Sequence, residues 1–291
     1  MRETRSRPSP RTLASEPIAH GNTSDIWPWT EQTVVKILRP GIPAHWAAIE
    51  ADIVARVHAA GLPVPATDGV VEVEGRTGIV LERIEGESMW ERMKAGPSQV
   101  PDLLAMLVDL QVQLHAAEVD GLPDLSRRLG VKIDEAVQIP AADRRRAQAM
   151  LAGLPAGNAL CHGDFHPANI ALTAHGPIVL DWFDAATGHP AADLVRSSLL
   201  MRPPEENSWL SGATQELLDL VHSSYVCWLA QLGLIDARVF APWEAVVAVA
   251  RMSEPVPTDD LLAIWRSWRA DGQAAAETMI ERCLAQAAGQ D

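Results

Sequence analysis

The chain reads Cys161-His162-Gly163-Asp164-Phe165-His166-Pro167-Ala168-Asn169 at its densest cluster of polar residues. The cluster is expected in a loop entered from a strand, and loops on a rigid scaffold are where functional residues concentrate. Asp181 follows twelve residues after Asn169, at the end of the apolar run Ile178-Val179-Leu180. Turn residues from Thr173 to Pro177 predict a hairpin between them, which can bring Asn169 and Asp181 side by side.

The spacing of Asp164, Asn169 and Asp181 is typical of phosphoryl transfer. That reaction needs a carboxylate to orient the acceptor hydroxyl and oxygen ligands for the Mg²⁺ that neutralises the phosphates. Kinase catalytic loops supply both through an Asp followed five residues later by an Asn, with a second metal-binding Asp downstream. A single loop Asp is usually a cap or turn former, but three positions in the right order weaken that explanation.

Lys36 is a charged residue within the apolar strand expected over residues 34–38, where kinases carry the lysine that pairs with nucleotide phosphates. Its partner should be a carboxylate on the next helix, predicted over residues 44–59. Glu50 falls on the inward stripe of that helix, and a buried carboxylate must be paired because an unpaired charge costs several kcal/mol. Asp52 lies on the outer face and is the poorer candidate. The apolar residues of the stripe are Trp46, Ile49, Ile53 and Val57.

Composition indicates an ordinary globular protein. The 291 residues are 47% hydrophobic and 21% charged, and the three cysteines lie far apart, which argues against a disulfide framework or a cysteine zinc site. No apolar run is long enough to span a bilayer, and the start lacks the apolar centre of a secretory signal. We therefore expect a soluble, cytoplasmic protein.

The formal net charge of −14 disfavours nucleic acid and anionic membranes as partners. It would attract a cationic substrate, although an acidic surface that only keeps the protein soluble explains it equally well. The first 16 residues carry four arginines among Ser and Pro and are expected to form a flexible tail, with a nucleic-acid arm as the alternative.

The periodicity of the apolar residues changes along the chain. Short runs at residues 34–38, 70–73 and 78–81 predict strands of one sheet, whereas after Gly86 the spacing is helical almost everywhere, apart from residues 158–183. We expect an α+β protein with a tail over residues 1–16, a nucleotide-binding lobe over 17–86 and a helical lobe over 87–291 that holds the catalytic loop.

Taken together, these motifs resemble the aminoglycoside phosphotransferase family of kinase-like enzymes, which includes choline and homoserine kinases. Residues 162–169 carry the strongest likeness, followed by Ile178 to Trp182 and by Gly188 to Leu194. Weaker likenesses are found at residues 35–38, 61–65 and 80–86. The resemblance implies a bilobal protein-kinase-like fold, with a five-stranded sheet and one helix in the small lobe.

The resemblance also implies roles for individual residues. Asp164 would be the catalytic base, Asn169 and Asp181 would bind Mg²⁺, and Lys36 would hold the phosphates of ATP or GTP with Glu50 orienting it. A hinge from Glu82 to Ile84 would meet the base of the nucleotide. His162 and Asp193 would support the catalytic loop, and Asp184 would face the substrate or else begin a helix or turn.

Two further features of the sequence bear on the substrate and on nucleotide binding. Protein kinases have Arg between the loop His and Asp, where this chain has Gly163, so transfer to a small molecule is favoured over transfer to protein. The small residues from His20 to Asp25, Ser24 among them, could let backbone N–H groups approach phosphates, but a plain hairpin turn is the better interpretation.

Two other functions remain possible from the sequence. His162, Asp164 and His166 could ligate zinc in a hydrolase, although no further ligand motif accompanies them. The second possible function is that of a nucleotide-binding regulator without transfer activity. The aromatic residues after Asp193 could stack on a substrate, but core packing is the more frequent use. The acceptor and the oligomeric state are not readable from the sequence.

Overall fold

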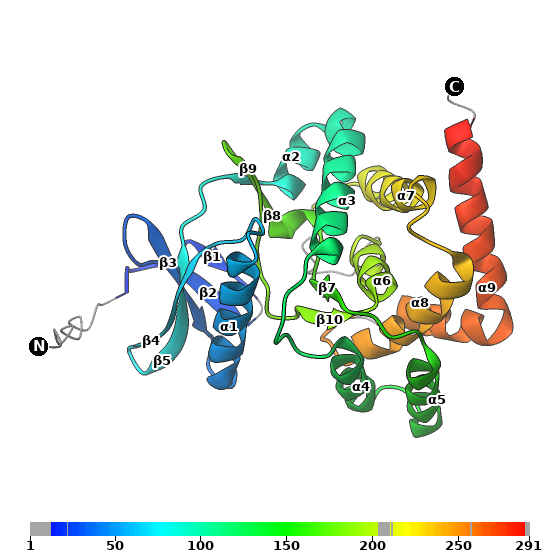
Figure 1. Ribbon diagram of the computed structural model, residues 1–291, viewed down its shortest axis with the longest axis horizontal. Coiled ribbons are helices and arrows are strands. Elements are labelled where there is room, and N and C mark those ends of the chain that lie inside the picture. The colour runs from blue at the N-terminus through cyan, green and yellow to red at the C-terminus, as the bar shows by residue number, and fades with distance from the viewer. Residues whose placement is uncertain (1–12, 22, 203–209, 211, 257, 289–291) are drawn as a thin grey trace, which may run out of the picture. The chain divides into compact units, whose positions relative to one another are not determined.

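The computed structural model (Figure 1) describes residues 13–21, 23–202, 210, 212–256 and 258–288, the side chains of 269–276 and 286–288 excepted. Most of the expected tail, together with Asn22 and Trp209, lies outside the described residues. The chain divides into two compact units. The first comprises Met1–Gly86 and Thr173–Phe183, and the second comprises Glu87–Leu172 and Asp184–Asp291.

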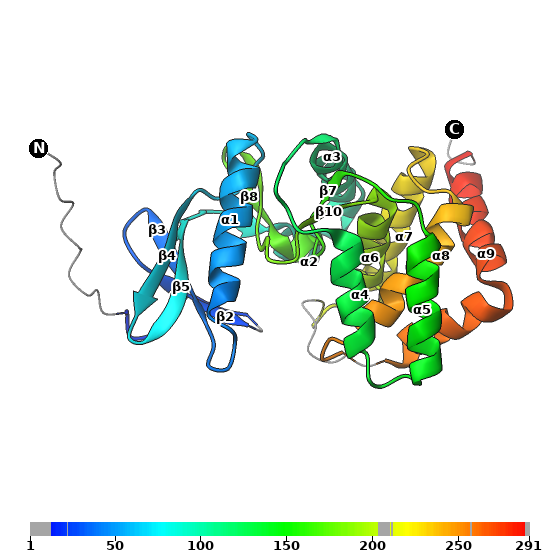
Figure 2. The ribbon, with the colours of Figure 1, turned by 60° about the horizontal axis from the view of Figure 1, so that its bottom comes forward.

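The first unit contains an antiparallel five-stranded sheet with the order β1-β2-β3-β5-β4. The strands are β1 (Ala19–His20), β2 (Ser24–Pro28), β3 (Thr33–Leu38), β4 (Thr67–Val73) and β5 (Arg76–Glu82). Helix α1 (His45–Ala59) packs beside β4 and β5 (Figure 2). The sheet and its single helix agree with the expected architecture of the small lobe.

The alternation of β3 gives the sheet two different faces. Val35 and Ile37 are buried with Val73 and Val80 in one apolar cluster. The alternate residue Leu38 packs with Ala47 and Ala51 of α1 in another. Lys36 shares the face of Leu38 by the same period of two, so its side chain is directed to the helix side of the sheet.

Strand β9 (Gly176–Val179) belongs to the first unit although it follows the catalytic loop in sequence. The backbone N–H of Val179 donates to the carbonyl of Pro63 over 2.7 Å. The segment that carries Asp181 is thereby fixed to the part of the first unit that follows α1.

The second unit is mainly helical and holds short strands around the catalytic loop. Its helices are α2 (Met89–Ala95), α3 (Val100–Ala116), α4 (Leu125–Glu135), α5 (Ala141–Gly153), α6 (Pro190–Leu200), α7 (Gln215–Gln231), α8 (Ala237–Arg251) and α9 (Asp259–Ala288). The shorter elements are β6 (Glu87–Ser88), η1 (Pro97–Gln99), β7 (Ala159–Cys161), η2 (Pro167–Asn169), β8 (Ile170–Thr173) and β10 (Ala186–Gly188). Figure 2 shows α4 and α5 side by side.

The predicted apolar stripes are mostly buried. Leu103, Leu107, Leu110 and Leu114 of α3 all lie in the core. One residue of the stripe predicted over residues 44–59 was predicted wrongly, because Ile49 of α1 is 37% exposed. Helical spacing across residues 217, 221, 228 and 232 likewise predicts a buried Leu232, but this residue lies just past the end of α7 and is 50% exposed. Position within a helical stripe gives only an average direction, and the width of the neighbouring element decides which edge residues are covered.

Two negative findings concern the described part of the chain. No described helix combines the length and the apolar character that crossing a bilayer requires. None of Cys161, Cys227 and Cys283 forms a disulfide.

Candidate active site

The first unit pairs Lys36 with two carboxylates, and we call these three residues the ammonium cluster. Lys36 Nζ donates to Glu50 Oε1 over 2.7 Å and to Asp181 Oδ1 over 2.9 Å. Lys36 and Glu50 are buried, whereas the Asp181 side chain is 48% exposed. Burial alone would lower the pKa of Lys36, but Asp181 and Glu50 raise it above its ordinary value. The amine therefore stays charged, and one of its partners also faces solvent.

Asp181 is held in this cluster by the residues that follow it. Its φ of 62° lies in the left-handed region, which Asp tolerates better than most residues. Trp182 is buried and its Nε1 donates to the carbonyl of Val179 over 2.9 Å. The ring of Phe183 stacks on Trp46 of α1 at a centroid distance of 4.7 Å. The side chains of Trp182 and Phe183 thus fix the backbone directly after Asp181, whose positive φ costs free energy.

The second unit holds Asp164 and Asn169 close together in the loop after β7. Asn169 Nδ2 donates to the Asp164 carbonyl over 2.9 Å and to Asp164 Oδ2 over 3.1 Å. The Asp164 side chain is 27% exposed. Burial alone would raise its pKa, but His166, Arg196 and His162 together lower it below its usual range. Asp164 is thus an ionised carboxylate that can accept a hydrogen bond from a hydroxyl.

Gly163 makes this loop possible. Its φ is 78°, and a Cβ at this position would lie 2.6 Å from the backbone oxygen of Asp184. Its N–H donates to Asp193 Oδ1 over 2.7 Å, and its carbonyl accepts from Arg196 Nε over 3.0 Å. A side chain between His162 and Asp164 would therefore collide with the following segment, which explains the glycine where protein kinases have arginine.

Asp193 and His162 make hydrogen bonds to the backbone of the loop at Gly163 and Asp164. Asp193 Oδ2 accepts from Gln111 Nε2 and lies within hydrogen-bond distance of His115 Nε2, both at 2.9 Å. Burial alone would raise the pKa of Asp193, but His115, Gln111 and the Gly163 N–H lower it. His162 is fully buried, and its Nδ1 accepts from the Asp164 N–H over 3.2 Å. These contacts fit the supporting role expected for both residues.

Several residues of the site were not found from the sequence. Gln111 and His115 interrupt the apolar face of α3, and a polar pair on that face was a usable signal. Arg196 gave no signal, because its spacing from Asp193 matches no motif considered. It lies 3.8 Å from Asp164 Oδ1, measured from Nη2, and is thus a direct neighbour of the predicted base.

The nucleotide-side candidates all belong to the first unit. Ser24 is buried in β2, and the carbonyl of Ser24 accepts from the Gly21 N–H over 2.8 Å, which closes the turn. The Glu82 N–H donates to the carbonyl of Ala66, and Glu82 Oε2 accepts from the Ala66 N–H over 3.1 Å. Ile84 follows β5 in an irregular segment and is partly buried. The hinge role of Glu82 and Ile84 stays a prediction.

The zinc hypothesis gains no support from the geometry. The Nδ1 atom of His162 already accepts a backbone hydrogen bond, and His166 Nε2 lies 3.5 Å from Asp164 Oδ2. Within the described ranges, no three His, Cys, Asp or Glu side chains are grouped so as to hold a metal ion.

The fold is the kinase-like fold of several solved aminoglycoside phosphotransferases and of a choline/ethanolamine kinase family protein. The apo form of a thermostable mutant of the aminoglycoside phosphotransferase APH(4)-Ia matches with a TM-score of 0.60 at 14% identity, over 93% of this chain and 95% of the other. A choline/ethanolamine kinase family protein from Mesorhizobium loti matches with a TM-score of 0.52 at 18% identity, over 93% and 86%. APH(2")-IIia in complex with GDP and kanamycin matches with 0.53 at 17% identity, over 95% of both chains. At these identities the likeness establishes the fold, and it confirms the expected bilobal kinase-like class.

The family follows from the sequence match. The phosphotransferase enzyme family matches residues 15–223, which is most of the chain and includes Lys36, Asp164 and Asp181. The chain belongs to this phosphotransferase family, as the motifs predicted. No curated protein sequence matches it.

Proposed function

We propose that this protein transfers the γ-phosphoryl group of a nucleoside triphosphate to a hydroxyl of a small molecule, with Asp164 as the base. The observation that carries the proposal is the contact of Asn169 with Asp164, which holds an ionised carboxylate next to an amide in the kinase spacing. Membership of the phosphotransferase family supports the reaction class.

Asp164 would act mainly by orientation. An ionised carboxylate accepts a hydrogen bond from the acceptor hydroxyl and directs its oxygen at the γ-phosphorus. The new bond joins that oxygen to phosphorus, the bond to the β-phosphate oxygen breaks, and the hydroxyl proton moves to Asp164. The nucleoside diphosphate leaves.

Lys36 would bind the phosphates of the nucleotide. Its ammonium is charged and is oriented by hydrogen bonds to Glu50 and Asp181. Similar structures contain nucleotides: one APH(4)-Ia complex holds ADP, another AMP-PNP, and an APH(2")-IIia complex holds GDP. ATP and GTP are therefore both candidates for the donor.

The residues present suit magnesium. The amide nitrogen of Asn169 donates to Asp164, so the amide oxygen of Asn169 is directed away from Asp164. The side chain of Asp181 is 48% exposed. Amide and carboxylate oxygens are the ligand types that Mg²⁺ takes. Asn169 and Asp181 would hold the ion, which when bound would neutralise the charge of the terminal phosphates.

The test is the Asp164→Ala variant. We expect its kcat to fall at least about a hundredfold, since a positioned acid–base group contributes factors of that size. Binding of a fluorescent magnesium-nucleotide should change little, because Asp164 contacts the acceptor. Nucleoside-diphosphate release across aminoglycosides, amino alcohols, sugars and amino acids, with and without magnesium, provides the measurement.

Asp109→Ala, an exposed change on α3, is the matched control and should keep full activity. Wild-type turnover by Asp164→Ala would remove Asp164 from the base role. Nucleotide binding with no release of diphosphate from any acceptor, nor slow hydrolysis with magnesium, would instead favour the regulator without transfer activity.

A further inference from the structure

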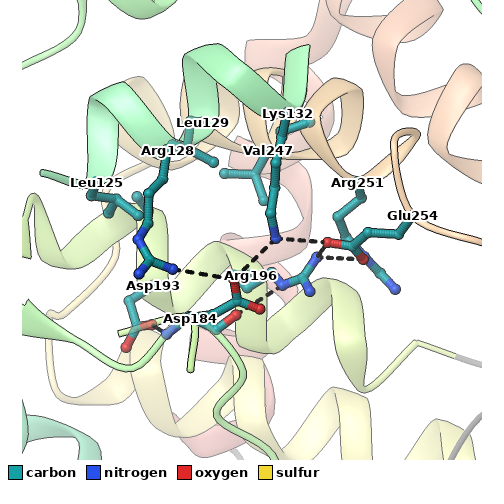
Figure 3. Close-up of a pocket in the computed structure, with 13 residues that line it drawn as sticks. Leu125, Arg128, Leu129, Lys132, Asp184, Asp193, Arg196, Val247, Arg251 and Glu254 are labelled. Carbon is teal, nitrogen blue, oxygen red and sulfur yellow. Dashed lines mark hydrogen bonds and ion pairs between the residues drawn. The ribbon is translucent and has the colours of Figure 1, made fainter. Parts of the chain in front are cut away.

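A pocket in the second unit lies beside Asp164, and Arg196 is the residue that joins the two. The pocket is lined by residues of α4, α6 and α8, by Gly163 of the catalytic loop and by Asp184 (Figure 3). Arg196 of α6 is one of the lining residues, and its side chain is only 12% exposed. Its Nη2 lies 3.8 Å from Asp164 Oδ1. Arg196 therefore neighbours both the pocket and the predicted base.

The charges around this pocket are balanced. Four cations line it, and four carboxylates accompany them once Asp164 is counted. The cations are Arg128, Lys132, Arg196 and Arg251, and the carboxylates are Asp164, Asp184, Asp193 and Glu254. The pocket thus does not share the acidic excess of the whole chain, and the geometry of its ion pairs says more about its role than their sum.

The guanidinium of Arg196 directs its three nitrogens at three different groups. Nε donates to the Gly163 carbonyl over 3.0 Å. Nη1 donates to Glu254 Oε2 over 3.0 Å and lies 2.9 Å from Oε1, and Nη2 is the nitrogen that faces Asp164. Because a guanidinium is planar and its donors have fixed directions, one side chain ties the loop backbone and the Asp164 carboxylate to Glu254.

The carboxylate of Asp164 has different neighbours at its two oxygens. Oδ2 accepts from Asn169 Nδ2 over 3.1 Å and lies 3.5 Å from His166 Nε2. Oδ1 faces Arg196 at 3.8 Å, which suits an ion pair but is longer than a hydrogen bond. The direction of this carboxylate is therefore set from both sides, and Arg196 is the neighbour on the Oδ1 side.

Glu254 is held in turn by cations from other helices (Figure 3). It follows α8, and its N–H donates to the Arg251 carbonyl over 2.9 Å. Lys132 Nζ of α4 lies 3.2 Å from Oε1, and Arg251 Nε lies 3.5 Å from Oε2. Burial alone would raise the pKa of Glu254, but Arg196, Lys132 and Arg251 lower it to about 2. Glu254 thus stays ionised and fixed where it can orient Arg196.

Resting on the proposed phosphotransferase function, we propose that Arg196 is a positioning residue for Asp164 and that Glu254 orients Arg196 for this role. Arg196 would hold the base through the Gly163 carbonyl and through its charge beside Oδ1. The acceptor hydroxyl reacts when the carboxylate points at it in the right geometry, and a displacement of about 1 Å can cost about a hundredfold in rate.

The first experiment compares Arg196→Lys and Arg196→Gln in the diphosphate-release assay, with water and the acceptors of the screen as probes. We expect kcat to fall about ten- to a hundredfold in both variants, because lysine keeps the charge but has one nitrogen in place of three. KM for the magnesium-nucleotide should stay within about threefold, because a positioned base acts on the chemical step. Wild-type kcat in either variant, or a loss confined to KM, overturns the proposal.

Arg202→Gln is the matched control. Arg202 also lies at the end of α6 and forms an ion pair with a glutamate of α8, Glu244. Its loss removes an arginine–glutamate pair of the same kind, so kcat per folded molecule should keep the wild-type value. The folded fraction of each variant is measured by circular dichroism at the assay temperature. A fall in kcat as large as that of Arg196→Gln would make the effect a general loss of packing and overturn the positioning role.

Glu254→Gln tests the orienting step and leaves Arg196 in place. We expect kcat to fall about three- to tenfold, because a neutral amide holds a guanidinium less firmly than a carboxylate does. The double variant Arg196→Gln, Glu254→Gln should be no slower than Arg196→Gln, because residues that act through one contact are not additive. Losses that multiply in the double variant would overturn the role of Glu254.

Amide hydrogen exchange of the full chain measures the positioning without turnover. Peptides over residues 159–172 cover the catalytic loop with the strands β7 and β8 on either side. We expect exchange of the loop to be about tenfold faster in Arg196→Gln than in the wild type, as for loss of one hydrogen bond to a charged group. Arg202→Gln should exchange as the wild type does. Equal exchange in Arg196→Gln and the wild type overturns the proposal.

The two readouts separate this proposal from the proposed function. Faster loop exchange in Arg196→Gln, combined with no transfer by the wild type to any acceptor, would contradict the kinase function and support the positioning of Asp164 by Arg196. Transfer by the wild type that is undiminished in both Arg196 variants would support the kinase function and contradict the positioning role.

Discussion

The ammonium cluster of the first unit and the cations around Glu254 in the second unit distribute charge in opposite ways. In the first unit one lysine lies between two carboxylates, and one of these, Asp181, is half exposed. In the second unit three cations, Lys132, Arg196 and Arg251, lie around the single carboxylate of Glu254. The carboxylate oxygens around Lys36 suit a metal cation, whereas the three cations in the second unit keep Glu254 ionised.

The difference teaches that the two clusters should respond differently to loss of a member. Lys36 is a single cation next to a buried carboxylate, so its removal changes the charge balance of the cluster completely. Glu254 has three cationic neighbours, and two would remain if one were removed.

Lys36→Met should have the largest effect on stability. It removes the ammonium next to the buried Glu50, and breaking a buried ion pair costs about 3 to 5 kcal/mol. Urea unfolding would measure the loss, and the double variant Lys36→Met, Glu50→Gln should recover part of it. A loss below about 1 kcal/mol would show that the cluster is weakly coupled to folding.

Glu254→Gln should remove a defined part of the acid sensitivity. The folded pKa of Glu254 is lowered from 4.5 to about 2, so its stabilisation is complete above pH 4.5 and is lost as the pH falls toward 2. Between pH 4.5 and about 2 the Glu254 carboxylate contributes up to about 3 kcal/mol to the free energy of unfolding, at about 1.4 kcal/mol per pKa unit. Unfolding free energies of both proteins across the window measure it. If the unfolding free energies of the two proteins changed in parallel with pH, the neighbouring cations would not be what keeps Glu254 ionised.

Gly163→Ala should cost about 1 to 2 kcal/mol or more, because the residue has a positive φ and its new Cβ meets the Asp184 backbone. The same movement displaces Asp164, so kcat should fall further than stability alone explains. Gly176→Ala is the control, since Gly176 also has a positive φ but no atom lies near its added Cβ. Equal losses in the two variants would leave φ, and not the contact with Asp184, as the cause.

Asp52→Asn should have the smallest effect. Asp52 pairs with Arg56 one turn later on α1 at 2.7 Å, and the side chains are 56% and 41% exposed. Such pairs contribute about 0.3 to 0.5 kcal/mol. Thermal unfolding and nucleotide binding should both stay near the wild type. A loss as large as that of Lys36→Met would contradict the choice of Glu50 over Asp52.

Local pattern was sufficient for much of the fold and for part of the site. The kinase-like position of Lys36 in an apolar strand and the inward helical stripe of α1 predicted that Glu50 pairs with Lys36, and the two form a 2.7 Å pair. Spacing likewise predicted that Asp164 and Asn169 lie together, since five residues of loop keep them close. The site roles of these residues remain predictions, and so does joint metal binding by Asn169 and Asp181.

The group of cations around Glu254 could not be predicted in this way. Lys132 and Glu254 are 122 residues apart and form an ion pair, yet each looks like an ordinary surface charge on its own helix. No periodicity distinguishes a charge that will line a pocket from one that will face solvent.

What the sequence determined by itself is the class of the protein, through residue types at short, fixed spacings that local backbone geometry converts into contacts. What only the tertiary structure decided is the charge of the pocket beside Asp164. That charge depends on how α4, α6 and α8 pack, and a net charge summed along the chain carries no information about which side chains meet.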